Sequence, residues 1–235
     1  MTDTTQADAA TTYRENLALV LDVDDLVSAL RLARELQPWF GVAKVGLELF
    51  AASGPEAVTS LVDLGYEVFL DLKLHDIPTT VRKAAKVAGG LGASYLTIHA
   101  MGGPAMLHAG VEGFLDGAAA VGLPAPTSLA VTVLTSDNDA PEHILPKRVG
   151  LAIEAGAGGV ICAGTDVGMV RQLGPRLKVV VPGTRQPGAE RHDQARVTTP
   201  GDALRAGADL LVIGRMVTEA PDPARAAEAL VASLD

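Results

Sequence analysis

Short apolar runs alternate with longer amphipathic segments along almost the whole chain. Eight runs rich in β-branched residues or leucine are typical of strands, and they lie at Leu17–Leu21, Val42–Val45, Glu67–Leu70, Tyr95–Ile98, Ser128–Leu134, Val160–Cys162, Val179–Val181 and Leu210–Ile213. Segments with helical spacing lie near 24–37, 55–64, 79–90, 104–120, 146–156, 166–174, 200–207 and 222–233. Most runs are almost continuously apolar, as in parallel strands that are buried on both faces. The pattern therefore predicts about eight consecutive β/α units.

Eight such units in 235 residues predict an α/β fold, a single (β/α)8 TIM barrel. An open, doubly wound parallel sheet is the alternative that the same alternation allows. No linker or low-complexity tract divides the chain, so we expect residues 14–235 to form one barrel domain. Residues 1–13, rich in Thr, Ala and Asp, are expected to form a flexible N-terminal tail.

Composition excludes several classes of function. The chain carries 28 acidic and 19 basic side chains, a formal net charge of −9, and only 3% aromatic residues. Binding to a nucleic-acid polymer needs clustered basic or stacking side chains, so this class is not expected. Residues 1–12 contain no Lys or Arg and no apolar run, so a secretory signal is not expected, and no stretch approaches the ~20 apolar residues of a membrane span. With a single cysteine, Cys162, we expect a cytoplasmic protein that binds no membrane.

Polar side chains stand at the C-terminal ends of nearly all the predicted strands. They are Asp22, Lys44, Asp71, Lys73, His99, Thr135, Arg185 and Arg215. In a TIM barrel the C-terminal ends of the strands meet at one face, and that face carries the chemistry. Polar ends on apolar strand bodies therefore predict a functional site at the barrel mouth.

The densest polar segment is 71–80, with the sequence Asp-Leu-Lys-Leu-His-Asp-Ile-Pro-Thr-Thr. Asp71 and Lys73 are two residues apart, so they share one face of an extended strand. Lys44, from the neighbouring strand, can join them in an alternating Lys–Asp–Lys array. Opposite charges at close range keep each other ionised, and a charged ammonium can donate a proton. The alternative is a salt-bridge network that only closes the barrel mouth.

The last two predicted strands are followed by glycine and arginine. Gly183 and Arg185 follow the seventh strand, and Gly214 and Arg215 follow the eighth. The corresponding loops are the usual phosphate site of a TIM barrel, since glycine lets backbone N–H groups approach an anion and arginine offers a bidentate fork. These glycines would otherwise serve only as turn residues. The five histidines show no paired-ligand spacing, so a zinc site is not expected, and His99 is interpreted as a hydrogen-bond partner at the mouth.

The residues at 71–78 closely resemble the signature of the orotidine 5′-phosphate decarboxylase family in its bacterial form. Shorter matching pieces occur in order at 21–22, 44–46, 97–100, 133–136, 182–185 and 213–215, so the resemblance runs from about residue 17 to the end. It implies a homodimeric TIM barrel that converts orotidine 5′-phosphate to UMP and CO₂, the last step of de novo UMP biosynthesis. It also implies that neither a metal nor an organic cofactor takes part.

The resemblance assigns the charged residues to the reaction. Asp22 and Lys44 would contact the ribose hydroxyls, and Lys44, Asp71 and Lys73 would form the charged array. Loss of CO₂ leaves a carbanion at C6 of the pyrimidine that the ring delocalises poorly. Lys73 would stabilise this carbanion and then supply the proton.

The remaining matches concern the partner subunit and substrate binding. Asp76, also catalytic, and Thr80 would reach into the neighbouring subunit's site. Five positions would bind substrate: Thr135 at the pyrimidine edge, Gln194 between base and phosphate, and Arg185, Arg215 and the Gly214 N–H at the phosphate.

Two other functions are compatible with parts of this pattern. A related barrel with a D-x-K-x-x-D motif acts as a Mg²⁺-dependent 3-keto-L-gulonate 6-phosphate decarboxylase or hexulose-phosphate synthase. Lys44 stands where those enzymes place a metal-binding carboxylate, and the 183–199 loop is long enough to cover a nucleotide; both features favour the nucleotide enzyme. A catalytically inactive barrel that senses UMP-like nucleotides is the other alternative, although every expected charged position is occupied.

Overall fold

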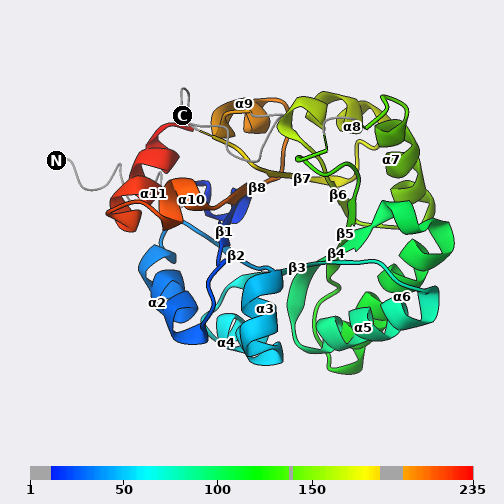
Figure 1. Ribbon diagram of the computed structural model, residues 1–235, viewed down its shortest axis with the longest axis horizontal. Coiled ribbons are helices and arrows are strands. Elements are labelled where there is room, and N and C mark those ends of the chain that lie inside the picture. Colours follow the sequence, from blue (N-terminus) through cyan, green and yellow to red (C-terminus); the bar gives the residue numbers. More distant parts are fainter. Residues whose placement is uncertain (1–11, 138–139, 186–197, 235) are drawn as a thin grey trace.

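Eight parallel strands close into a barrel in the order of the sequence (Figure 1). This computed structural model describes residues 12–137, 140–185 and 198–234. The strands are β1 (Leu17–Val20), β2 (Val42–Val45), β3 (Glu67–Leu74), β4 (Ala93–His99), β5 (Thr127–Val131), β6 (Gly159–Ile161), β7 (Lys178–Pro182) and β8 (Leu210–Ile213). Strand β1 pairs with β8 as well as with β2, which confirms the TIM barrel and excludes the open sheet.

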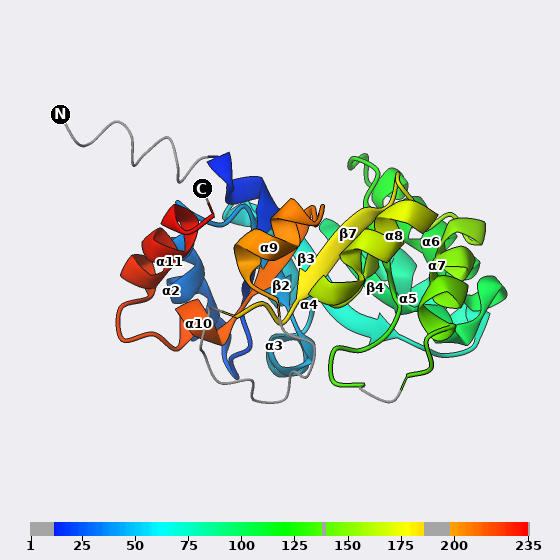
Figure 2. The ribbon, with the colours of Figure 1, turned by 90° about the horizontal axis from the view of Figure 1, so that it is seen from above.

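Helices surround the strands on the outside, as Figures 1 and 2 show. The helices that correspond to predicted segments are α2 (Leu26–Leu36), α4 (Pro55–Asp63), α5 (Pro78–Gly90), α6 (Pro104–Ala120), α7 (Ile144–Glu154), α8 (Val167–Leu173), α9 (Pro200–Arg205) and α11 (Pro223–Ala232). These eight agree with the predicted helices to within a few residues. Two short helices that the periodicity did not predict, α3 (Leu47–Ser53) and α10 (Arg215–Thr218), directly follow β2 and β8. Three 3-10 turns complete the described structure: η1 (Arg14–Asn16), η2 (Ala100–Gly102) and η3 (Gly164–Asp166).

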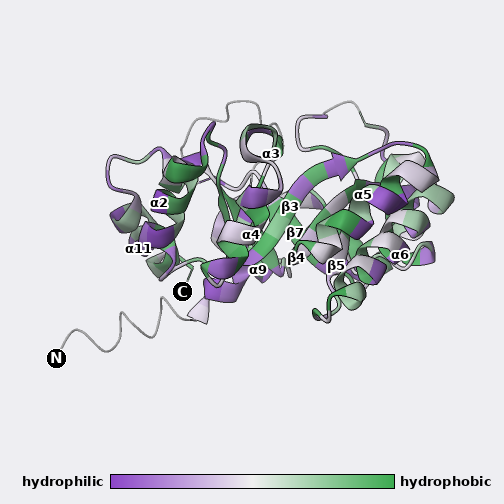
Figure 3. Cartoon of the chain, turned by 90° about the horizontal axis from the view of Figure 1, so that it is seen from below, coloured by the Kyte–Doolittle hydropathy of each residue, from purple (hydrophilic) through white to green (hydrophobic). Residues whose placement is uncertain are grey.

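The apolar residues form two separate layers. One fills the interior of the barrel and consists of Ala18, Val42, Phe69, Tyr95, Leu129, Val131, Ile161, Val180, Leu210 and Val212. The other, larger layer lies between the strands and the helices. Figure 3 shows apolar strand bodies, with hydrophilic residues on the outer faces of the helices. Because each strand packs on both faces, its sequence has almost no polar alternation.

Two strand ends differ from the prediction. Strand β3 continues to Leu74 rather than ending at Leu70, and its register against β4 shifts between these residues. Strand β5 ends at Val131, not at Leu134. Beyond it, the backbone N–H and the hydroxyl of Thr132 both donate to the carbonyl of Ile161 on β6. Leu134 is 41% exposed and does not extend the strand.

The N-terminal segment is described only in part. Residues 1–11 of the predicted tail lie outside the described residues, so the domain boundary at residue 14 stays a prediction. Among the described helices, none is long and apolar enough to cross a membrane.

Candidate active site

Three neighbouring strands direct polar side chains into the C-terminal mouth of the barrel. Side chains alternate along a strand, so Lys44 of β2, Asp71 of β3 and Thr97 of β4 share the interior face with the apolar residues below them. The pairing of Phe69 with Tyr95 places an edge-on aromatic contact, with 6.1 Å between ring centroids, in the layer beneath. A packed layer of apolar side chains therefore lies directly below the polar mouth.

Four charged side chains form an alternating chain across this mouth. The Nζ of Lys44 lies 3.0 Å from Oδ1 of Asp22 and 3.8 Å from Oδ2 of Asp71. The Nζ of Lys73 lies 2.8 Å from the same Asp71 oxygen. The predicted Lys–Asp–Lys array is thus present, and Asp22 extends it by one carboxylate. Lys44 is the most buried member, with 8% of its side chain exposed, whereas Lys73 is 35% exposed and reaches solvent.

Asp71 is ionised in this arrangement. Burial alone raises the pKa of its carboxyl, but the ammonium groups of Lys44 and Lys73 and a hydrogen bond from Thr97 outweigh burial and lower the pKa below the model-compound value. The two lysines therefore share a permanent negative charge between them. Such an arrangement holds an ammonium group in place, as a proton donor requires.

Lys73 sits in an unusual backbone conformation. Its φ of +49° is in the left-handed region, which non-glycine residues rarely adopt. Four residue steps on β3, from Leu70 to Leu74, face only two on β4, from Leu96 to Ile98, so β3 bulges here. Asp71 and Lys73 meet as predicted, but through a bulge and not through a regular extended strand.

Gly46 makes room for the outer ion pair. A Cβ at this position would lie 2.6 Å from Oδ1 of Asp22 and 2.9 Å from Nζ of Lys44. Any side chain would therefore push apart the carboxylate and the ammonium. This close approach explains why a glycine, and no larger residue, ends the 44–46 segment that resembles the family.

A pocket of about 540 Å³ adjoins the charged chain. Five of the predicted site residues line it: Asp22, Lys44, Arg185, Gly214 and Arg215. Gly183, which also lines it, has a φ of +75° and turns the chain after β7. Residues from both ends of the sequence are brought together because β1 and β8 are neighbours in the closed barrel.

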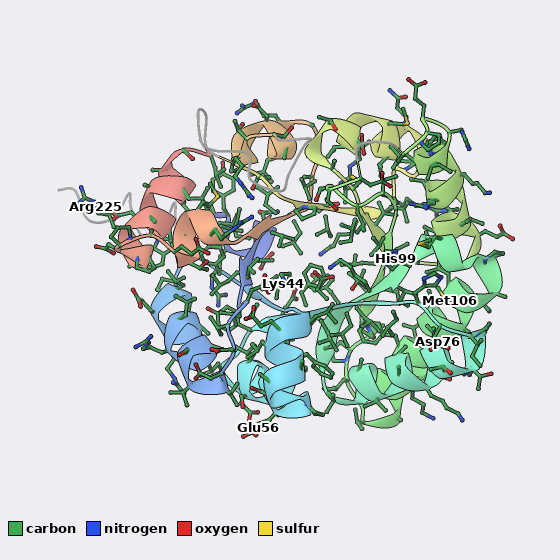
Figure 4. The ribbon with its side chains drawn as sticks, in the orientation of Figure 1. Lys44, Glu56, Asp76, His99, Met106 and Arg225 are labelled. Atoms are coloured by element: carbon green, nitrogen blue, oxygen red, sulfur yellow. The ribbon has the colours of Figure 1, made fainter. Side chains whose placement is uncertain are left out.

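Other predicted residues lie apart from this pocket. Asp76 and Thr80 are exposed at the start of α5, and Asp76 accepts a hydrogen bond from the Ile77 backbone N–H at 2.6 Å. In Figure 4, Lys44 lies near the centre of the barrel and Asp76 towards its edge, near α5 and α6. Thr135 is half-buried in the segment after β5, and Gln194 lies outside the described residues.

His99 differs from its interpretation as a hydrogen-bond partner. Its Nδ1 is buried without a hydrogen bond to any described residue. Its ring centroid lies 5.7 Å from that of His75. Burial, followed by the nearby His75 and Lys73, lowers its pKa, so the ring is neutral near pH 7.

Thr97 is the residue at the array that the sequence analysis did not single out. It is fully buried and hydrogen-bonded to both Asp71 and Lys73. A threonine two residues before a strand-end histidine is an ordinary β-strand residue, so only the alternation of β4 could have indicated that it faces the array. Over the described ranges, no group of three or more His, Cys, Asp or Glu side chains is placed to hold a metal ion.

Comparisons with known proteins agree with this geometry. The profile of the orotidine 5′-phosphate decarboxylase / HUMPS family matches residues 15–230. A protein of Anaeromyxobacter sp. (strain K) named orotidine 5′-phosphate decarboxylase is 47% identical over 223 residues, covering 94% of this chain and 98% of its own. A protein of the same name from Moorella thermoacetica is 44% identical, covering 94% and 93%.

A solved structure gives the same result. The crystal structure of orotidine 5′-phosphate decarboxylase from Lactobacillus acidophilus superposes with a TM-score of 0.77 and 33% sequence identity, over 94% of this chain and 99% of that one. The family profile covers the barrel strands and every charged residue of the mouth described above. The chain belongs to the orotidine 5′-phosphate decarboxylase / HUMPS family.

Proposed function

We infer that this chain is an orotidine 5′-phosphate decarboxylase, which releases CO₂ from its substrate to give UMP, the last step of de novo UMP biosynthesis. The observation that carries this function is the alternating chain Asp22–Lys44–Asp71–Lys73 beside a pocket lined by two arginines. The array supplies a fixed positive charge and a proton. The arginines supply a site for the phosphate.

The reaction needs a cation where the carbon–carboxylate bond breaks. Departure of CO₂ leaves an electron pair on C6 of the pyrimidine, and an ammonium group placed there stabilises the pair before giving it a proton. Lys73 is suited to this role, because its Nζ is held 2.8 Å from Asp71 and is still partly exposed to the mouth. Asp71, kept ionised by both lysines, holds that ammonium group in place.

Phosphate binding at the other side of the pocket contributes at a distance from the reacting carbon. Arg185 and Arg215 line the same pocket as Asp22 and Lys44, so one ligand can contact both sets of residues. Binding energy from a non-reacting phosphate can organise the charged groups for the transition state. Thr135 and Gln194 are assigned to the base by the family resemblance.

A Mg²⁺-dependent sugar-phosphate reaction is not favoured. The Lys44 ammonium lies between two carboxylates, Asp22 and Asp71, where a divalent cation would otherwise balance their charge. The deciding experiment is CO₂ release from orotidine 5′-phosphate in the presence and absence of excess EDTA. Full activity in EDTA is expected. Strict dependence on Mg²⁺ would overturn the assignment. Absence of CO₂ release from orotidine 5′-phosphate would also overturn it, and would leave the sugar-phosphate lyase and the inactive nucleotide-binding barrel as the two candidates.

The homodimer is part of the proposal, with Asp76 and Thr80 reaching the partner's site. Both are exposed and stand beside Ile77, an apolar side chain that is 65% exposed at the mouth end of the barrel. The nearby Met101 is 55% exposed. Exposed apolar groups next to functional polar ones are typical of an interface that completes a site.

Mixed dimers test this arrangement. Lys44→Ala and Asp76→Ala subunits are each inactive alone, but a mixed dimer has one site with both native residues. Random exchange makes half of the dimers mixed, so about a quarter of the wild-type activity is expected. Absence of recovery in subunits that demonstrably exchange would show that each site is built from one chain.

We place the reaction in the cytoplasm. The chain's single cysteine, Cys162, is buried and has no second cysteine in the chain with which to form a disulfide, as suits a reducing compartment.

A further inference from the structure

Thr97 occupies the one position of β4 that faces the bulge of β3. The register pairs Leu70 with Leu96 and Leu74 with Ile98, so Thr97 alone stands opposite Asp71, Leu72 and Lys73. It is fully buried, with 0% of its surface exposed. A bulge leaves backbone groups without their ladder partners, and these groups need another partner.

The Thr97 hydroxyl makes two hydrogen bonds at this point. Its Oγ1 accepts from the backbone N–H of Lys73 at 2.8 Å and donates to Oδ1 of Asp71 at 3.0 Å. The first bond replaces the ladder partner that the bulge removes. The second occupies the carboxylate oxygen that does not bind the lysines, since both Nζ atoms lie closest to Oδ2.

The position of the Lys73 ammonium depends on the Lys73 backbone conformation and on the orientation of the Asp71 carboxylate. These two hydrogen bonds restrain both. The backbone of Lys73 is in the left-handed region at φ +49°, which costs about 1 kcal/mol or more and persists only where surrounding contacts hold it. The Asp71 carboxylate can rotate about its side-chain bonds unless both oxygens are engaged. The Thr97 hydroxyl therefore restrains both the Lys73 backbone, from which the side chain extends, and the Asp71 carboxylate, which binds the ammonium group at its end.

We propose that Thr97 is the positioning residue of the reaction, whose hydroxyl holds the Lys73 backbone and the Asp71 carboxylate so that the Lys73 ammonium points at the reacting carbon. The proposal rests on the decarboxylase function inferred above. Thr97 touches no substrate in this assignment. It acts through Asp71 and Lys73.

Threonine suits the task better than its isosteres. Valine has the same shape but neither donor nor acceptor, so it would leave the Lys73 N–H and one Asp71 oxygen buried without a partner. Serine keeps the hydroxyl but lacks the methyl group that restricts χ1. The two variants therefore separate loss of the hydroxyl from loss of packing.

Three variants test the proposal: Thr97→Val, Thr97→Ser and, as a matched control, Thr132→Val. Thr132 is also a buried threonine at the mouth end of a neighbouring strand, and its hydroxyl donates to a backbone carbonyl at 2.6 Å. Both valine variants lose a buried hydroxyl, so both are expected to lower the unfolding temperature. The measurements are kcat, KM, the Kd for UMP and the unfolding temperature.

Thr97→Val is expected to lower kcat by about 10- to 100-fold, the penalty for reacting groups displaced by about an ångström. Its Kd for UMP is expected to stay within about threefold of wild type, because the phosphate contacts are intact. Thr97→Ser is expected to recover most of kcat, and Thr132→Val to retain it. Equal losses of kcat in Thr97→Val and Thr132→Val, or no recovery in Thr97→Ser, would overturn the proposal.

A measurement without substrate keeps the test separate from the proposed function. The carboxyl carbon of Asp71, followed by ¹³C NMR during acidification, reports the pKa of that group directly. Thr97→Ser is the variant to use if Thr97→Val does not fold, with wild type as reference. Loss of the donor in Thr97→Val should raise this pKa, and Thr97→Ser should keep it near wild type. An unchanged pKa in Thr97→Val, or a serine variant that folds but has a raised pKa, would refute the role of the hydroxyl, whatever reaction the barrel performs.

Discussion

The two ends of the barrel interior carry similar side chains in different surroundings. At the C-terminal end, Lys44, Asp71 and Lys73 are held directly as ion pairs beside a pocket of about 540 Å³. At the N-terminal end, the Tyr95 hydroxyl donates to Glu67 at 2.8 Å and accepts from Lys178 at 2.9 Å. Glu67 and Tyr95 line two smaller pockets at that end, of about 320 and 250 Å³, and the smaller of these is also lined by Lys178 and Arg14.

Strand β3 contributes to both ends on one face. Glu67 begins the strand at the N-terminal end of the barrel, and Phe69 lies in the apolar layer. Asp71 and Lys73 lie near the end of the strand, at the mouth of the barrel. At the N-terminal end a neutral phenol stands between the two charges, and Lys178 also packs 4.9 Å from the centroid of the Tyr95 ring. At the mouth two ammonium groups converge on one carboxylate.

The comparison shows that lysine and carboxylate side chains have different roles at the two ends of the barrel. A polar network that only closes a barrel is present at the N-terminal end, where Tyr95 joins Glu67 and Lys178 by hydrogen bonds and where TIM barrels use polar groups for stability. The array at the mouth keeps Lys73 accessible and leaves room for a ligand beside it. Substitutions at the mouth should therefore affect turnover, and those at the N-terminal end should affect the free energy of unfolding.

The largest effect is expected for Lys73→Ala. It removes both the cation at the reacting carbon and the proton donor, and each is worth about 10²–10⁴-fold, so kcat should fall by at least about 10⁴-fold. Single-turnover assays of CO₂ release measure this loss, with the unfolding temperature confirming the fold. Lys178→Ala, at the other end, is the control and should retain kcat. Substantial turnover by Lys73→Ala would remove Lys73 from the role of proton donor.

The next largest effect is expected for Arg215→Ala. Loss of a charged hydrogen bond to phosphate should cost about 2–3 kcal/mol of transition-state stabilisation. This loss lowers kcat/KM on the order of 10²-fold. Steady-state kinetics with orotidine 5′-phosphate measure it. Arg14→Ala, which changes an arginine of the N-terminal pocket, is the matched control and should leave kcat/KM unchanged. If both variants lost the same activity, the two ends would not differ as described.

Tyr95→Phe tests the comparison from the other end. It removes the hydroxyl that links Glu67 and Lys178 and should lower the free energy of unfolding by about 1–2 kcal/mol. Urea titration measures the loss, and kcat should stay at the wild-type value. A marked fall in kcat with unchanged stability would contradict the division between the two ends.

The smallest effects are the opposite pH dependences of the two ends, since each involves one proton over a narrow range. The pKa of Asp71 is lowered on folding, so its contribution to stability is present above about pH 3.8 and is lost as the pH falls through the folded-state pKa. Burial, followed by the hydrogen bond to Glu67, raises the pKa of Tyr95. Its contribution is present below about pH 10 and is lost as the pH rises further.

Unfolding curves recorded across both pH ranges check these signs. Asp71→Asn should reduce the loss of stability below pH 3.8 and leave the alkaline limb unchanged. Tyr95→Phe should reduce the alkaline loss and leave the acid limb unchanged. If both variants changed the same part of the pH dependence of stability, acid or alkaline, the two clusters would be coupled through the barrel.

The fold and most of the site residues could be predicted because they depend on local patterns. Continuous apolar runs, helical spacing and polar strand ends predicted eight units, their order and the face that carries the site. The prediction failed where tertiary contacts decide: β3 continues to Leu74 through a bulge against β4, and α10 is too short to produce a periodic pattern.

The sequence by itself determined the eight β/α units, the charged residues and their family, because periodicity and the 71–78 signature are written in consecutive residues. Closure of the barrel was decided by the pairing of β1 with β8. Only the tertiary structure decided that Lys44 lies between Asp22 and Asp71, that Lys73 lies in a bulge, and that Thr97 faces it. These contacts join residues 22 to 27 positions apart in the chain, from Lys44 with Asp22 to Asp71 with Lys44, where 71 − 44 = 27. The physical reason is that strand register and barrel closure, which depend on the packing of the whole chain, set the distances between such residues.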